Sequence, residues 1–166
     1  MRIERTFRYP MGIADSYAMA VTQGFQEKKC ADAGALSWTI DVTHSGAAVT
    51  VKTKRKLPTT TFPSLIRKFV PSGVTSTETI VWGPAEADGS RTAQLSVDFH
   101  GAPATMKGTV RLAPDGPDMT DVFVDAHFDA HVPLLGGRVE RLAAPIIIGV
   151  IDSEEVTAKA WAAGER

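Results

Sequence analysis

The chain has 166 residues, of which 43% are hydrophobic, and its 18 Lys and Arg against 19 Asp and Glu give a formal net charge of −1. This length predicts a single domain, covering residues 1–166, with a sizeable core. The balanced charge argues against nucleic acid as a partner, and the lack of a long apolar run argues against stable membrane insertion.

The N-terminal part predicts one strand and two short helices. Residues 2–9 alternate between polar and apolar side chains, as in a half-buried strand. Asp15 and Ser16 precede a short apolar run, which predicts a capped helix over about 15–21. A second short helix is expected over residues 24–33.

A hairpin is predicted next. Residues 36–43 and 48–56 both alternate, and Ser45-Gly46 between them suits a two-residue loop. This loop would place Val42 opposite Val49. The apolar positions then share one face of the pair, which supports the pairing.

Residues 57–73 interrupt the strands with a short amphipathic segment between Pro63 and Pro71. Its apolar positions are Phe62, Leu65, Ile66, Phe69 and Val70. Two interpretations remain open: a gate over a cavity, or a cap on one open end of the sheet.

Four more alternating segments follow, over residues 75–82, 92–100, 105–112 and 120–132, and a long helix is expected from Gly137 to Trp161. Seven strands joined mainly by hairpins predict an antiparallel sheet. With the helices gathered on one face of this sheet, the fold class is α+β.

Several short motifs resemble one known family. They are Leu57-Pro58, Phe62-Pro63, Trp82-Gly83, Gly101-Ala102-Pro103, Gly108 with Leu112, the Pro-Leu-Leu-Gly-Gly run at 133–137, and Trp161. The chain is similar to the DUF2505 family of the START/polyketide cyclase superfamily (SRPBCC, Bet v 1-like). This resemblance implies a helix-grip fold, in which a curved seven-stranded sheet holds the C-terminal helix, with an apolar cavity between them. It implies no established reaction.

The inward-facing side chains form the candidate ligand-binding set. We expect the cavity to be lined by Trp38, Ile40, Val51, Arg55, Phe62, Leu65, Phe69, Glu78, Trp82, Val97, Phe99, Met106, Phe128, Leu142, Ile146 and Val150. One interpretation is a pocket for a hydrophobic small molecule. The other is a core filled completely by its own side chains.

Arg55 and Glu78 are charged residues within this inward set, on strands that we expect to be neighbours. They could orient a polar group of a ligand, or they could form a structural ion pair, because buried charges require partners.

The row Asp125, His127, Asp129 and His131 resembles a metal site, but alternate residues on a strand lie about 6.6 Å apart, so one ion could bind at most two of them. We expect this row to face solvent and to form a cross-strand charge ladder, with Lys107 opposite Asp125 or a neighbour on the same face. No metal site and no cofactor is predicted.

Three functions remain open: a carrier or sensor of a lipid-like or polyketide-like molecule, a cyclase or hydratase that uses Glu78 as an acid with a raised pKa, and an interaction module with a filled interior. Cys30 is the single cysteine, so no internal disulfide is expected. The N-terminal residues lack the apolar core of a signal peptide, and the expected location is cytoplasmic.

Overall fold

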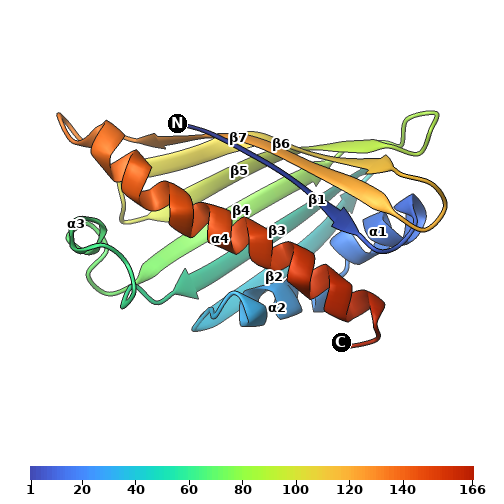
Figure 1. The fold of residues 1–166 in the computed structure, drawn as a ribbon, viewed down its shortest axis with the longest axis horizontal. Coiled ribbons are helices and arrows are strands. Elements are labelled where there is room, and N and C mark those ends of the chain that lie inside the picture. The colour runs from blue at the N-terminus through green and yellow to red at the C-terminus, as the bar shows by residue number, and fades with distance from the viewer.

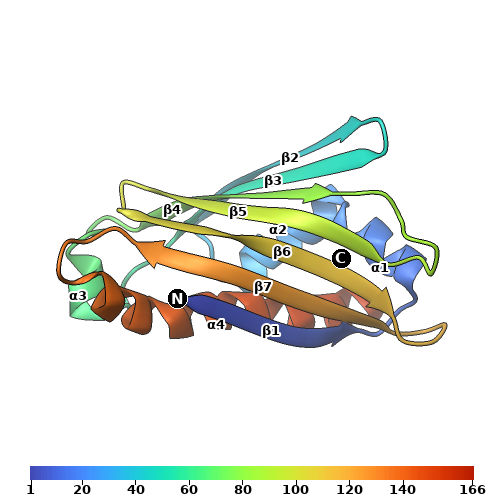
Figure 2. The same ribbon diagram turned by 90° about the horizontal axis from the view of Figure 1, so that it is seen from above.

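The computed structural model describes all residues from 1 to 166. In chain order its elements are β1 (Arg2–Tyr9), α1 (Ile13–Ala20), α2 (Gln23–Asp32), β2 (Ser37–Ser45), β3 (Ala48–Leu57), α3 (Ser64–Arg67), β4 (Val74–Trp82), β5 (Arg91–His100), β6 (Ala104–Pro114), β7 (Thr120–Ala130) and α4 (Gly136–Ala162). The strands form one layer, and α4 crosses one face of it diagonally (Figure 1). Seen from above, the helices lie on a single side of the sheet (Figure 2). The predicted α+β helix-grip fold is therefore confirmed.

All seven strands belong to one antiparallel sheet with the order β1-β7-β6-β5-β4-β3-β2. Strands that follow one another from β2 to β7 are neighbours, because short turns or loops join them. β1 completes the sheet by pairing with β7. The alternation expected from the sequence holds along β7, where the even-numbered residues from Val122 to Phe128 are all buried. These side chains face α4, so the apolar face of the sheet is the covered one.

The predicted hairpin between β2 and β3 forms with a different register. Ser45 pairs with Ala48, so the two loop residues are Gly46 and Ala47, one position later than expected. Gly46 takes the first of these positions with φ +59°, a conformation that favours glycine. Val42 consequently lies opposite Val51 rather than Val49. A shift by two residues leaves every side chain on its predicted face.

The charge ladder on β7 forms with a different strand from the one expected. Lys107 of β6 lies opposite His127, the neighbour of Asp125 on the same face, as the prediction allowed. Asp125 instead binds Arg2 of β1, whose guanidinium donates to both carboxylate oxygens at 2.9 and 2.8 Å. The row does face solvent, and the ion pair of Asp125 with Arg2 lies on the β1 side of the strand.

The long helix α4 is held at its C-terminal half. Arg5 of β1 donates two hydrogen bonds of 2.8 Å to Asp152, and the ring of Trp161 packs edge-on against Phe25 of α2, with ring centroids 5.7 Å apart. The helix extends over 27 residues, close to the predicted range, and continues through Pro145.

The amphipathic segment between β3 and β4 is less helical than expected. Only Ser64–Arg67 form a helix, with Pro63 as the preceding residue. Lys68 and Phe69 follow in a turn, because Pro71 cannot supply the N–H that a continuing helix needs. The segment nevertheless covers one end of the layer between sheet and helix (Figure 1).

Candidate ligand cavity

A cavity of about 150 Å³ lies between α4, the α3 segment and strands β3 to β7, and 19 of its 26 lining residues are hydrophobic. A space of this volume is several times what one water molecule needs. The interior is thus not completely filled by its own side chains, which removes the main premise of the filled-core interpretation.

Ten of the sixteen candidate residues line this cavity. They are Arg55, Phe62, Phe69, Glu78, Val97, Phe99, Met106, Phe128, Ile146 and Val150. They come from five strands, the α3 segment and α4, so the fold brings together residues that lie up to 95 positions apart in the sequence. Phe99 and Phe128 meet edge-to-face, with ring centroids 5.7 Å apart, and form part of its wall.

The other six candidates lie elsewhere. They are Trp38, Ile40, Val51, Leu65, Trp82 and Leu142. Trp38 belongs to the edge strand β2 and is 38% exposed. Trp82 is buried, but it packs against Tyr17 of α1 at a centroid distance of 5.8 Å. The helix α1 therefore covers part of the inward sheet face, so an inward side chain such as Trp82 packs against a helix instead of lining the cavity.

Sixteen lining residues were not predicted. They are Lys29, Leu57, Ile66, Val70, Val74, Ser76, Ala102, Pro103, Ala104, Val132, Val139, Ala143, Ile147, Ile151, Ser153 and Glu154. Most continue the apolar patterns of segments already assigned to the cavity. Lys29 and Glu154 differ, because they bring charges from two helices.

Lys29, Arg55, Glu78 and Glu154, which we call the charge cluster, lie together at one end of the cavity. Lys29 Nζ is 2.7 Å from Glu154 Oε2 and 3.7 Å from Glu78 Oε1, and Arg55 Nη2 is 3.6 Å from Glu78 Oε2. The side chains of Lys29 and Arg55 are 8% and 7% exposed. Tyr9 also donates its hydroxyl hydrogen to Glu154. The cluster thus joins α2, β3, β4 and α4 around two positive and two negative charges.

The pKa shifts of Glu78 and Lys29 favour the charged form of both groups. Burial would raise the pKa of Glu78, but the charges of Lys29 and Arg55 outweigh burial and hold that pKa below its ordinary value. Burial would lower the pKa of Lys29, whereas Glu154 and Glu78 raise it, and this pKa lies above its ordinary value. Glu78 is thus ionised and Lys29 protonated, so neither an acidic Glu78 nor a neutral, nucleophilic Lys29 is available.

Two buried atoms of the cluster have no hydrogen-bond partner: Arg55 Nε and Glu78 Oε1. The first is a donor and the second an acceptor, so the hydrogen-bonding capacity of the cluster is not fully used within the chain. Cys30 lies close by and is fully buried, and burial raises the pKa of its thiol.

Within residues 1–166, no three His, Cys, Asp or Glu side chains lie close enough to hold a metal ion. None of the helices combines the length and the apolar character needed to cross a membrane.

Comparisons with known proteins agree with this architecture. The family model described as a protein of unknown function (DUF2505) matches residues 4–162. A search of the curated proteins finds no match. Among solved structures, TTHA0849 from Thermus thermophilus has a TM-score of 0.62 at 13% identity, over 95% of this chain and 97% of that one. A START superfamily protein from Mycobacterium smegmatis has a TM-score of 0.58 at 13% identity, over 95% and 96%.

An enzyme has the same fold. Norcoclaurine synthase from Thalictrum flavum has a TM-score of 0.57 at 10% identity, over 98% of this chain and 92% of that one. At these identities the likeness concerns the fold alone. The fold thus occurs in proteins of different kinds, and the function must be argued from the cavity itself.

Proposed function

The chain belongs to the DUF2505 family. We propose that it binds an amphipathic small molecule between α4 and the sheet, and that an uncharged polar group of this molecule lies next to the charge cluster. The observation that carries this proposal is a largely apolar cavity with four charged side chains at one end. Such a combination, a mostly apolar wall with a few polar groups that fix orientation, is typical of small-molecule sites.

The apolar wall would supply the affinity. Each square ångström of apolar ligand surface removed from water contributes roughly 25 cal/mol. A dry apolar cavity of roughly 150 Å³ can take up a molecule the size of benzene. We therefore propose a ligand body of about one ring, or a short alkyl chain, held by residues such as Phe99, Met106, Phe128 and Ile146.

The charge cluster would select the polar end. Its two cations and two carboxylates already balance, so a charged ligand group would add a buried charge without a partner, which is costly. A hydroxyl group, in contrast, adds no charge, and it can accept a hydrogen bond from a cation or donate one to a carboxylate of the cluster. An alcohol or phenol suits this site better than a carboxylate of the same shape.

A matched pair of ligands tests this proposal. We would titrate the protein with phenol and with benzoate at pH 7.5, and with hexanol and hexanoate, by calorimetry and by shifts in melting temperature. The neutral member of each pair is expected to bind at least tenfold more tightly. Preference for the carboxylates would contradict the role given to the charge cluster, and no binding of either class would contradict the proposal as a whole.

Two valine variants provide the matched control. Val97→Phe introduces a ring into the cavity wall and is expected to abolish binding. Val81→Phe adds the same ring to β4, where the side chain is 37% exposed and does not line the cavity, and should leave binding unchanged. Equal effects of both variants would show that the ligand occupies another site.

The enzyme alternative receives less support. Acid catalysis by Glu78 requires a raised pKa, and the neighbouring cations have the opposite effect on it. We therefore propose binding rather than turnover.

A further inference from the structure

Three segments meet at one end of the molecule, which we call the loop end: residues 56–73, 100–105 and 131–141. They contain α3, the β5–β6 turn and the start of α4, and they lie side by side in both ribbon views (Figures 1 and 2). Side chains from all three line the cavity, so the loop end is also one end of the proposed binding site.

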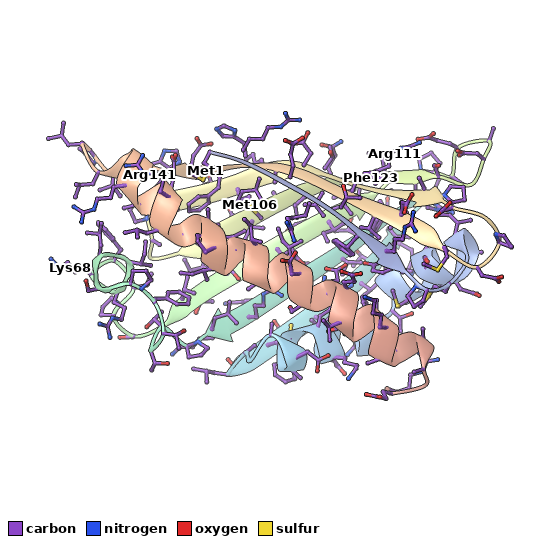
Figure 3. The ribbon with its side chains drawn as sticks, viewed as in Figure 1. Met1, Lys68, Met106, Arg111, Phe123 and Arg141 are labelled. Atoms are coloured by element: carbon purple, nitrogen blue, oxygen red, sulfur yellow. The ribbon has the colours of Figure 1, made fainter.

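The loop end is strongly basic in a protein whose net charge is −1. Its five Lys and Arg are Lys56, Arg67, Lys68, Arg138 and Arg141, and none of them takes part in an ion pair. Its single acid, Glu140, is engaged by the N-terminal ammonium and by the Ala130 N–H. Figure 3 shows Lys68 and Arg141 at this end and Arg111 at the opposite one.

The opposite end of the sheet lacks such a group of cations in its turns. Residues 83–90 and 115–119 carry four acids and no Lys or Arg, and two of these acids, Glu86 and Asp115, pair with Arg111 and Arg8 of the adjoining strands. The loop end therefore differs from the opposite end in carrying several cations that form no ion pair. A flat anionic surface would attract the loop end more strongly than the other end.

Apolar side chains are exposed among these cations. Leu134 is fully exposed and is the one non-glycine residue with a positive φ, at +63°. This conformation is unfavourable for a leucine, and the side chain makes no compensating contact within the chain. The neighbouring Leu135 is 38% exposed, and Phe62 and Phe69 are half-buried.

The outer side of α4 extends this apolar surface away from the loop end. Between Arg141 and Asp152 the helix contains no charged residue. Pro145 and Gly149 are exposed there, and Ile148 is half-exposed. A surface helix in contact with water normally carries polar side chains on its outer face.

We propose that the loop end docks on the surface of an anionic lipid bilayer, with Leu134 and Leu135 inserted at the headgroup boundary and the cations near the lipid phosphates. Exposed leucines surrounded by cations that have no partner in the chain fit an anionic, apolar interface. Docking in this orientation places one end of the cavity against the membrane, where an amphipathic ligand can enter or leave without crossing water.

Co-sedimentation with vesicles tests the proposal. The protein is expected to bind vesicles of phosphatidylcholine with 30% phosphatidylglycerol at low salt, and to bind vesicles of phosphatidylcholine alone far more weakly. Each cation near an anionic surface contributes about fivefold in affinity. Replacing Arg67, Lys68, Arg138 and Arg141 together by Gln should therefore weaken binding on the order of 100-fold or more, and Leu134→Ser about tenfold.

The matched control is the double variant Lys52→Gln with Lys54→Gln, which removes two exposed cations from β3 outside the loop end. This double variant should lower the affinity for anionic vesicles much less than the replacement of any two loop-end cations by Gln. An equal loss of affinity on replacing two loop-end cations would show a general attraction between charges and overturn the proposal. An absence of binding to the anionic vesicles would also overturn it.

A fluorescent label tests the orientation. Because Cys30 is fully buried, a new surface cysteine can be labelled selectively. An environment-sensitive dye on Leu134→Cys should shift its emission to the blue when anionic vesicles are added, whereas the dye on Asp118→Cys should not. Equal shifts at both ends would refute docking through the loop end. Because no cavity ligand is added, the outcome does not depend on the proposed ligand.

Discussion

Replacing Lys29 by Met is the most direct test of the charge cluster. The variant keeps the length of the side chain but leaves Glu78 and Glu154 with Arg55 as the remaining cation. Removing one partner of a buried ion pair costs about 3–5 kcal/mol, because the remaining charge stays buried. For a domain of this size, that loss should lower the melting temperature by about 10 °C.

The pH dependence of this loss provides the decisive measurement. In the wild type, the lowered pKa of Glu78 gives stability that is present above its unfolded pKa of about 4.3 and is lost as the pH falls through the folded value. Without Lys29, burial dominates and the pKa of Glu78 rises. Lowering the pH from 7.5 to 5, toward that raised pKa, then favours the neutral carboxyl in the folded variant, so the difference in unfolding free energy from the wild type should narrow as the pH falls.

Chemical denaturation at both pH values measures these differences. Lys28→Met is the matched control, because Lys28 lies on the same helix and pairs with Asp32 at 3.5 Å within that helix. It should cost less than about 1 kcal/mol at either pH. A Lys29→Met variant as stable as this control, with no dependence on pH, would refute the reasoning that a buried network connects α2 to α4.

Three further substitutions test the packing by chemical denaturation. Gly108→Ala should destabilise by about 3 kcal/mol, because its Cβ would lie 2.1 Å from the Asp125 carbonyl oxygen; a neutral result would mean that β6 and β7 separate easily. Gly149→Ala should stabilise by about 1 kcal/mol, because nothing lies within 4 Å of the added Cβ in the helix, and a loss would show an unexpected contact. Thr120→Val should cost about 1–2 kcal/mol, because it removes the buried hydrogen bond from Ser16 Oγ, at 2.9 Å; no loss would mean that water replaces it.

Which residues face the interior could be predicted from the sequence, because the side chains of a strand alternate with a period of two. The strand β7 illustrates this, since each expected inward residue from Val122 to Phe128 is buried. The pairing register is harder to predict. In the β2–β3 hairpin, a loop at Gly46-Ala47 and a loop at Ser45-Gly46 both keep the apolar faces together, and only the conformation of the turn distinguishes them.

Which inward-facing residues line the cavity was harder to predict than which residues face inward. An inward residue on a strand contacts a ligand only if no helix covers it, and the sequence does not say where α1 and α2 will lie on the sheet. Trp82 and Val97 are both inward and apolar, but Trp82 packs against α1 while Val97 lines the cavity. Their strands are neighbours, and the difference arises from the position of the helices.

Only half of the charge cluster could be predicted from the sequence. Arg55 and Glu78 could be identified as inward charges. They form a long ion pair, with Arg55 Nη2 at 3.6 Å from Glu78 Oε2. Lys29 and Glu154 could not be identified, because a charged position on a helix is usually solvated and its orientation depends on packing. Lys29 of α2 and Glu154 of α4 both contact the cluster. A ligand group that binds Arg55 or Glu78 would therefore also change the ion pairs that hold α2 and α4. Ligand binding should therefore change the position or rigidity of α4, the helix that begins at the loop end.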